Sequence, residues 1–151
     1  MHPVLTQRDI AIRHHVYQTC VQETLPPSPA ATAEAFGIGL REAEESYLRL
    51  HQNHLLFLEP NDATVRMANP FSAIPTPFRV AVGDKQYYAN CAWDMLGIPA
   101  MLGVDAVLDG EYSDTGQSTR MIVEQGRVHH EEGVIHFPLP VRQWYDDLIL
   151  T

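Results

Sequence analysis

Residues 87–103 read YYANCAWDMLGIPAMLG and place one cysteine and one aspartate in an apolar run that Pro99 interrupts. If the stretch from Cys91 to Leu102 is helical, Cys91 and Asp94 are three positions apart and lie on one face. They can then address the same small ligand. A cysteine near a helix N-terminus also has a lowered pKa, so we expect more thiolate at neutral pH.

The two side chains have different chemical preferences. A thiolate favours soft metals, whereas a carboxylate is suited to holding or delivering a proton. Because Asp94 is surrounded in sequence by Trp93, Met95 and Leu96, it must find a partner or shift its pKa, and such perturbed groups gather at functional sites. Spacing alone leaves a second interpretation open, since a cysteine in an apolar run often serves as a small buried hydrophobe.

The run Tyr88–Leu96, followed by Pro99–Gly103, resembles the core motif of the organomercurial (alkylmercury) lyases. The order of elements resembles that family as well, with a helical N-terminal unit and a proline-rich bridge before a strand hairpin and the cysteine segment. The resemblance implies protonolysis of a carbon–mercury bond, with Cys91 as the mercury-binding thiolate and Asp94 as the proton donor. Both residues would be metal ligands. It implies no cofactor, with mercury(II) as the bound product.

Two features depart from the family pattern. The family uses a second cysteine well downstream of the first, but this sequence has none after Cys91, and Cys20 does not align with it. Thr151 is close to where that cysteine is expected, which predicts either a truncated sequence or a relative that works with one thiol. Asn90 stands where many relatives carry an aromatic residue. Tyr88 and Trp93 are the predicted substrate-binding residues, although aromatics in such positions, Tyr87 included, are often core.

Three functions therefore stay open. The first is an organomercurial lyase that gives mercury resistance. The second is a non-catalytic relative in which Cys91 and Asp94 bind a metal or a mercurial. The third is a transcriptional regulator, because three short helices followed by a hairpin is the winged-helix order. The third helix offers few basic residues for DNA, which favours a structural role for that unit.

Charge and composition restrict the classes of partner that the protein is expected to bind. Lys and Arg number 10 against 19 Asp and Glu, a net charge of −9 that repels nucleic-acid phosphates and anionic membranes. No secretory signal or membrane-spanning run is present in the sequence, which predicts a cytoplasmic protein with free thiols. The expected partners are a small organomercurial or soft metal ion and small thiols. A homodimer is left open.

The pattern predicts an α+β fold: a winged-helix-like three-helix unit at residues 1–70, and a small, mainly antiparallel sheet with flanking helices at residues 77–151. Prolines at 70, 75 and 77 mark the bridge and exclude a regular element there. The predicted helices are Asp9–Leu25, Ala30–Phe36 (capped by Ser28, with Pro29 first), Leu40–His54 and Val141–Leu150. The predicted strands are Leu55–Leu58, Thr64–Met67, Phe78–Val82, Gln86–Tyr88, Val104–Leu108, Thr119–Glu124 and Val134–Phe137, with turns at Asp109–Gly110 and Gln125–Gly126.

Histidines were the other candidate ligands. The run from His129 to Glu132 offers neighbouring donors, but adjacent strand residues point to opposite faces, so a solvated turn is the favoured interpretation. The pair at His14 and His15 is interpreted in the same way. No phosphate-binding loop, nucleotide motif or Ser-His-Asp signature occurs in the sequence.

Overall fold

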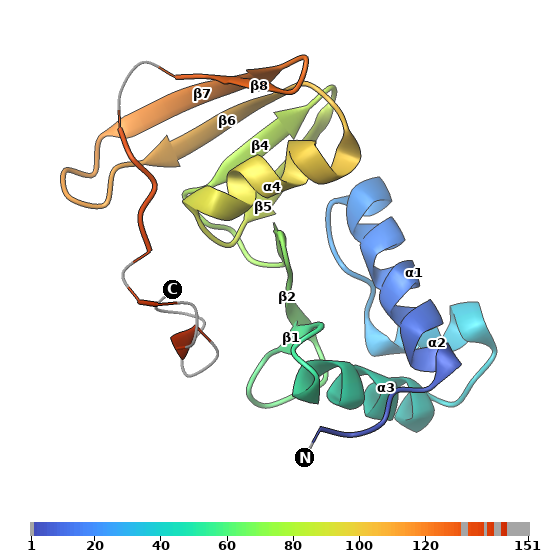
Figure 1. Cartoon of the computed structure of the whole chain (residues 1–151). Helices are drawn as coiled ribbons and strands as arrows, with labels where there is room; N and C mark the ends of the chain where they lie inside the picture. The colour runs from blue at the N-terminus through green and yellow to red at the C-terminus, as the bar shows by residue number, and fades with distance from the viewer. Residues whose placement is uncertain (1, 131–132, 138, 141–142, 145–151) are drawn as a thin grey trace.

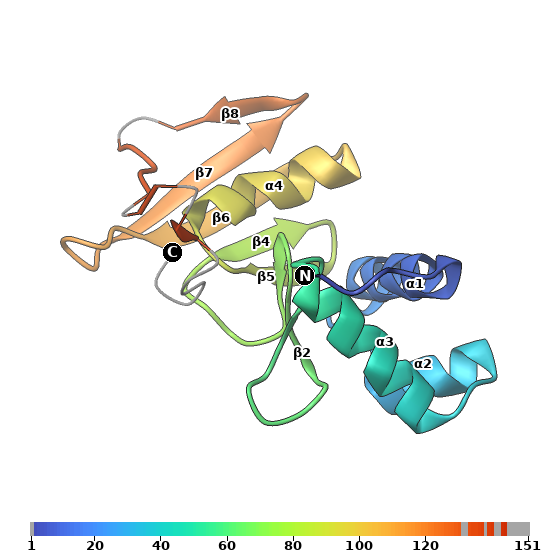
Figure 2. The ribbon, with the colours of Figure 1, turned by 60° about the horizontal axis from the view of Figure 1, so that its bottom comes forward.

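The computed structural model describes residues 2–130, 133–137, 139–140 and 143–144. Its helices are α1 (Gln7–Glu23), α2 (Pro29–Phe36), α3 (Leu40–Gln52) and α4 (Ala92–Leu102). Its strands are β1 (Phe57–Leu58), β2 (Val65–Ala68), β3 (Phe71–Ser72), β4 (Arg79–Val82), β5 (Lys85–Ala89), β6 (Ala106–Glu111), β7 (Ser118–Glu124) and β8 (Arg127–His129). Figures 1 and 2 show α1, α2 and α3 grouped to one side of β2, with α4 against the larger part of the sheet. The predicted α+β class is confirmed.

The first two helices begin at residues whose side chains satisfy free backbone amides. At α1, the Thr6 hydroxyl accepts a hydrogen bond from the Asp9 amide at 3.1 Å, and the Asp9 carboxylate accepts one from the Thr6 amide at 2.8 Å. Ser28 caps α2 and Pro29 is its first residue, as predicted. Gly37 ends α2 with φ at 61°, a left-handed conformation that favours glycine.

Asp9 also joins α1 to α3. Its fully buried carboxylate accepts hydrogen bonds from the Ser46 hydroxyl at 2.5 Å and from Arg49 Nη2 at 2.9 Å. Burial by itself would raise the pKa of Asp9, but the hydrogen bonds from Arg49, Ser46 and Thr6 outweigh it and hold that pKa well below its usual range. The contact between the two helices therefore depends on an ionised carboxylate.

Loss of the α2 cap is expected to have a modest effect. The Ser28 hydroxyl accepts from the Ala31 amide at 3.1 Å, so Ser28→Ala should lower the free energy of unfolding by about 1 kcal/mol. Urea unfolding measures this change. Ser113→Ala, in the exposed turn between β6 and β7, is the matched control and should change stability by less than about 0.5 kcal/mol. Equal losses in both variants would contradict the capping role.

The described strands form one antiparallel sheet with the order β1-β2-β3-β5-β4-β6-β7-β8. The expectation that the proline-rich bridge holds no regular element was wrong, because β3 lies inside it. Phe71 of β3 pairs with Ala68 on one side and with Ala89 on the other. Pairing with two neighbours stabilises even a very short strand. A division of the chain into units at residues 1–70 and 77–151 stays a prediction.

The second half of the sheet departs from the sequence pattern in two places. The turn predicted at Asp109–Gly110 was wrong, since both residues lie inside β6 and pair with Arg120 and Thr119 of β7. Val134–Phe137 was predicted as a strand but contains none; β8 follows the Gln125–Gly126 turn, which was predicted correctly. Most of the predicted helix Val141–Leu150 lies outside the described residues.

Helix α4 packs closely on the sheet and on the bridge. Met95 and Ile98 are buried against β4, β5 and β6. Pro99 was expected to interrupt this segment, but the helix continues through it. A Cβ atom at Gly110 would lie 3.0 Å from Cε of Met95, so glycine in β6 makes room for that side chain. A Cβ atom at Gly97 would lie 3.2 Å from Cβ of Pro70. Helix α4 is thereby fixed against residues 69–71.

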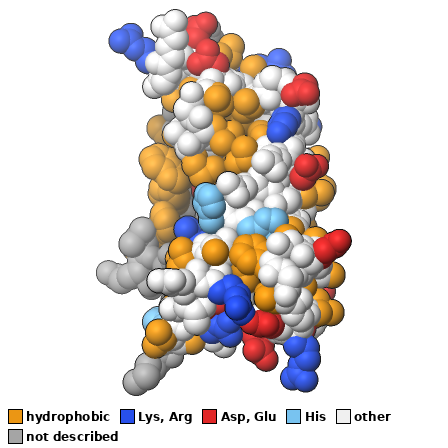
Figure 3. Space-filling model, turned by 90° about the vertical axis from the view of Figure 1, so that its right-hand side faces the viewer, with side chains coloured by type: hydrophobic (Ala, Val, Ile, Leu, Met, Phe, Trp, Pro, Cys, Tyr) orange, Lys and Arg blue, Asp and Glu red, His pale blue; other side chains and the backbone are white. Residues whose placement is uncertain are grey.

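On the face shown in Figure 3, Lys and Arg side chains lie beside Asp and Glu side chains rather than forming a continuous basic surface. Hydrophobic side chains gather on the upper part of the same face. In the part of the chain that the structure describes, no helix is long and apolar enough to cross a membrane.

Candidate functional site

Cys91 lies at the junction between strand β5 and helix α4. It is the N-cap residue of α4, with extended backbone angles of −151° and 177°, and its carbonyl accepts the first helical hydrogen bond from Met95 at 3.1 Å. The side chain is half-buried. Strand β5 ends at Ala89, the residue before Asn90. The apolar run after Cys91 forms α4, which packs on the sheet.

Asp94 lies in the first turn of α4, and the structure brings it together with Cys91. The Cys91 thiol and the Asp94 carboxylate are near enough for each to shift the pKa of the other. This contact agrees with the expectation that two residues three apart share one helix face. A sulfur nucleophile and a proton acceptor therefore lie side by side at a half-buried helix terminus.

The expected lowering of the Cys91 pKa by the helix N-terminus was wrong. Burial raises the pKa of the thiol, and the negative charge of Asp94 raises it further. The backbone amides of Trp93 and Asp94 act in the opposite direction but do not outweigh these effects. At neutral pH the thiol is therefore largely protonated, so mercury binding by Cys91 releases a proton that a base must take.

Asp94 is suited to be that base. Burial raises the pKa of its carboxyl group, while hydrogen bonds from Asn90 and Cys91 lower it and only partly offset the burial. The apolar neighbours of this aspartate predict that it finds a partner or shifts its pKa, and it does both. A carboxyl group with a raised pKa exchanges protons more readily near neutral pH than an ordinary aspartate does.

Asn90, which the sequence did not single out as a site residue, also contacts Asp94. Its Nδ2 donates to Oδ2 of Asp94 at 3.1 Å and to Oδ1 of Asn69 at 3.0 Å. The same nitrogen lies 3.3 Å from the carbonyl oxygens of Pro70 and Phe71. Local sequence carries no signal for this contact, because it joins α4 to a bridge some 20 residues earlier.

The aromatic residues of the motif occupy different environments. Tyr87 is core, since only 2% of it is exposed and its hydroxyl donates to the Val21 carbonyl at 2.8 Å. Strand alternation places Tyr88 on the opposite face of the sheet from Tyr87. Trp93 is 55% exposed, and its ring meets the Phe137 ring edge-on at 5.9 Å. A substrate-binding role for Tyr88 and Trp93 stays a prediction.

The other candidate ligands do not gather. Among the described residues, no group of three or more His, Cys, Asp or Glu side chains could hold a metal ion. His129 and His130 are exposed, while Glu131 and Glu132 lie outside the described residues. His14 is exposed, and His15 packs edge-on against Phe36 with its pKa lowered by burial.

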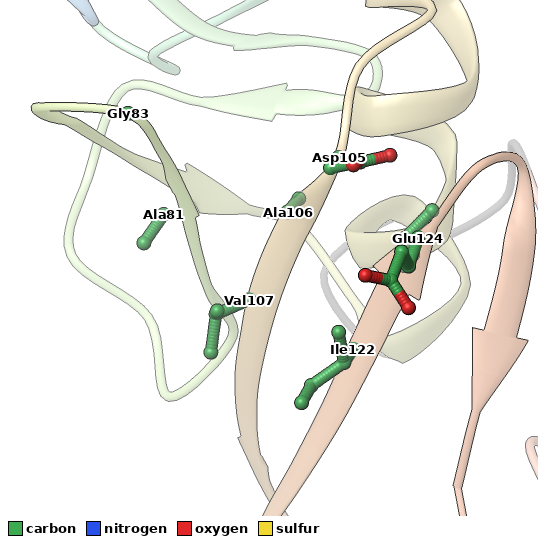
Figure 4. A pocket seen from close by; sticks show the side chains of 8 residues that line it. Ala81, Gly83, Asp105, Ala106, Val107, Ile122 and Glu124 are labelled. Atoms are coloured by element: carbon green, nitrogen blue, oxygen red, sulfur yellow. The ribbon is translucent and has the colours of Figure 1, made fainter.

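Figure 4 shows a hollow on the sheet, and neither Cys91 nor Asp94 is among the residues that line it. It is lined by residues of β4, β6 and β7 and of their loops, among them Ala81, Val107 and Ile122. Along β6, Val107 alternates with the buried Ala106 and Leu108, so its side chain points away from α4. The hollow therefore does not extend the site at the start of α4.

The two thiols are expected to react very differently. Cys20 is completely buried in α1, and burial raises its pKa to about 12, whereas Cys91 is partly accessible. A disulfide reagent should therefore modify one thiol in the native protein and two in denaturant. Cys91→Ser should remove the native reaction and leave the denatured one. Rapid modification of both thiols under native conditions would contradict the placement of Cys20.

Comparison with known proteins finds relatives of this chain. The sequence model of the family described as alkylmercury lyase matches residues 71–149. An alkylmercury lyase of Staphylococcus epidermidis is 44% identical over 55 residues, which are 36% of this chain and 26% of that protein. An alkylmercury lyase of Bacillus cereus is 38% identical over 55 residues, 36% of this chain and 25% of that protein.

The fold has a counterpart among solved structures. The mercury-bound form of MerB2 superimposes with a TM-score of 0.67 at 18% sequence identity, over 83% of this chain and 60% of that one. The matched stretches thus span about a quarter of the curated relatives. The family match itself extends over more than half of the 151 residues and includes both Cys91 and Asp94. The chain belongs to the alkylmercury lyase family.

Proposed function

We propose that this protein is an organomercurial lyase that cleaves carbon–mercury bonds by protonolysis. The observation that carries the proposal is the placement of the Cys91 thiol beside the Asp94 carboxylate in the first turn of α4, where each shifts the pKa of the other. Sulfur is the protein ligand that suits mercury best, and the neighbouring carboxylate can take up and return one proton. Membership of the alkylmercury lyase family supports the same chemistry.

In the proposed first step, the proton of Cys91 moves to the neighbouring Asp94 carboxylate. The resulting thiolate forms a sulfur–mercury bond with an organomercurial that arrives bound to a small thiol, and that small thiolate leaves. Because burial and the charge of Asp94 disfavour a free thiolate, the proton transfer and the sulfur–mercury bond are expected to be coupled. Mercury is the substrate here, and Cys91 is its first protein ligand.

In the second step, the protonated Asp94 gives its proton to the carbon atom. The electron pair of the carbon–mercury bond becomes the new carbon–hydrogen bond, and the hydrocarbon leaves. Mercury(II) stays on the Cys91 sulfur with the Asp94 carboxylate beside it. Mercury remains divalent throughout, so the reaction as proposed needs no redox cofactor.

A small thiol completes the cycle in this proposal. Cys91 and Asp94 supply one soft and one hard ligand, and mercury(II) prefers sulfur. Two small thiols can therefore remove the metal and leave one proton on Cys91 and one in solution. A cytoplasm rich in small thiols is the location that suits this step. Substrate contacts by Tyr88 and Trp93, and a homodimer, belong to the same set of predictions.

Turnover tests the proposal directly. Incubation with phenylmercury and excess small thiol is expected to release benzene in molar excess over the protein, measured by gas chromatography. Cys91→Ser should abolish the release, because it removes the sulfur that binds mercury. Cys20→Ser is the matched control and should leave benzene release unchanged once folding is verified. Stoichiometric uptake of mercury without any benzene would overturn the lyase and indicate a binding protein.

A further inference from the structure

The amide of Asn90 connects the site to residues 69–71, at the start of the proline-rich bridge. One nitrogen, Nδ2, faces four acceptors: Asp94 Oδ2 at 3.1 Å, Asn69 Oδ1 at 3.0 Å, and the carbonyls of Pro70 and Phe71 at 3.3 Å. An amide nitrogen carries two hydrogens, so the four acceptors share them. Because two backbone carbonyls and a carboxylate can only accept hydrogen bonds, the amide nitrogen of Asn90, and not its oxygen, must face them.

The opposite end of the same amide has no such support. In the part of the chain that the structure describes, the buried Oδ1 of Asn90 has no hydrogen-bond partner. An unsatisfied buried acceptor costs stability, and a residue that bears this cost commonly has a specific task. Packing alone therefore does not account for an asparagine at this position.

The bridge that anchors Asn90 is itself firmly placed. The Tyr17 hydroxyl on α1 donates to the Asn69 carbonyl at 2.9 Å. Phe71 is buried and paired on both sides within the sheet, and Pro70 contacts α4 at Gly97. A hydrogen bond from Asn90 therefore ties the Asp94 carboxylate to a rigid segment instead of to a loose side chain.

We propose that Asn90 is a positioning residue that orients the Asp94 carboxylate for proton transfer between Cys91 and the substrate carbon. The inference rests on the proposed lyase function, and it assigns a task to Asn90 that the proposed reaction steps do not use. Asn90 fixes one carboxylate oxygen, Oδ2, and so restricts the rotation of Asp94. The carboxylate then faces Cys91 without a search among rotamers, which favours proton delivery but not mercury binding.

Asn90→Leu removes the donor and nearly conserves the shape. In single-turnover reactions with phenylmercury, it is expected to slow benzene release about 10- to 100-fold, because a misplaced catalytic group costs a factor of this size. KM and the stoichiometry of mercury binding should stay unchanged, since Cys91 is intact. Asn53→Leu is the matched control, because Nδ2 of Asn53 donates to the carbonyls of Pro3 and Arg49 and not to Asp94. It should leave both kcat and KM unchanged.

A second measurement tests the contact without turnover. Asp94→Asn should shift the side-chain amide NMR resonances of Asn90 and leave those of Asn53 in place, because Asn90 donates to that carboxylate and Asn53 donates to Pro3 and Arg49 instead. Unchanged Asn90 resonances, or an Asn90→Leu variant with wild-type kcat, would overturn the inference. Equal slowing by Asn53→Leu would also overturn it, because the effect would then be one of general stability. Wild-type protein that releases no benzene contradicts the lyase proposal, and the NMR result then decides the Asn90–Asp94 contact alone.

Discussion

Replacing Asp9 with alanine is expected to lower the free energy of unfolding by about 3–5 kcal/mol, the usual cost of removing one partner of a buried ion pair. The Asp9 carboxylate is completely buried and receives hydrogen bonds from Ser46, from two nitrogens of Arg49 and from Thr6. Alanine leaves these donors without their acceptor and also removes the α1 capping box. Urea unfolding at pH 7 measures the loss.

The same contact predicts how stability depends on pH. The pKa of Asp9 is lower in the folded protein than in the unfolded chain, so its contribution is complete above the unfolded pKa of about 4. It is lost as the pH falls from there through the folded pKa. The gap between wild type and Asp9→Ala should therefore narrow progressively below about pH 4. A constant gap down to pH 2 would contradict the pKa shift.

A surface ion pair is the control for this prediction. Asp109 binds Arg120 across β6 and β7 at 2.7 Å, but the Arg120 side chain is 66% exposed. Asp109→Ala should therefore cost less than about 1 kcal/mol. If both aspartates gave the same loss, burial would not be the deciding factor.

The elements that the sequence predicted well are those whose boundaries depend on neighbouring residues. Ser28, Pro29 and Gly37 define the ends of α2 by local backbone chemistry alone. The turn at Gln125–Gly126 is also local, because both residues adopt positive φ angles. Such signals lie within a few positions of the structure that they determine.

The wrong predictions have tertiary causes. Asp109 and Gly110 are typical turn residues, yet both pair with residues of β7 in the register of the sheet, and Gly110 makes room for Met95 of α4. Strand β3 exists because Phe71 pairs with residues on two other strands. Neither cause is visible in a short window of sequence, because both depend on elements far along the chain.

The candidate site also has one part that local sequence predicts and another that depends on the tertiary fold. Cys91 and Asp94 are close in sequence and share one helix turn, so their spacing predicts the contact. Asn90 meets residues 69–71 only after the bridge folds back onto α4. The pKa of Cys91 was predicted in the wrong direction because helix position is a local signal, whereas burial is a property of the fold.

Asp94→Asn is expected to change two reactions of Cys91 in opposite directions. The variant removes the negative charge that raises the pKa of Cys91, so more thiolate is present at pH 8. Alkylation by neutral iodoacetamide should speed up about threefold for each unit by which that pKa falls, because the loss of intrinsic nucleophilicity offsets only part of the gain. Benzene release from phenylmercury should fall about 10²- to 10⁴-fold, because the amide cannot deliver a proton.

This opposition separates a proton donor from a residue that merely supports the fold. A structural role for Asp94 would lower both rates or neither, whereas a carboxylate that serves only to activate the thiol would make alkylation slower in the variant. Asp84→Asn, in the exposed turn between β4 and β5, is the matched control and should change neither rate. Faster alkylation together with undiminished benzene release would show that the proton comes from another group, and the assignment of Asp94 would then be wrong.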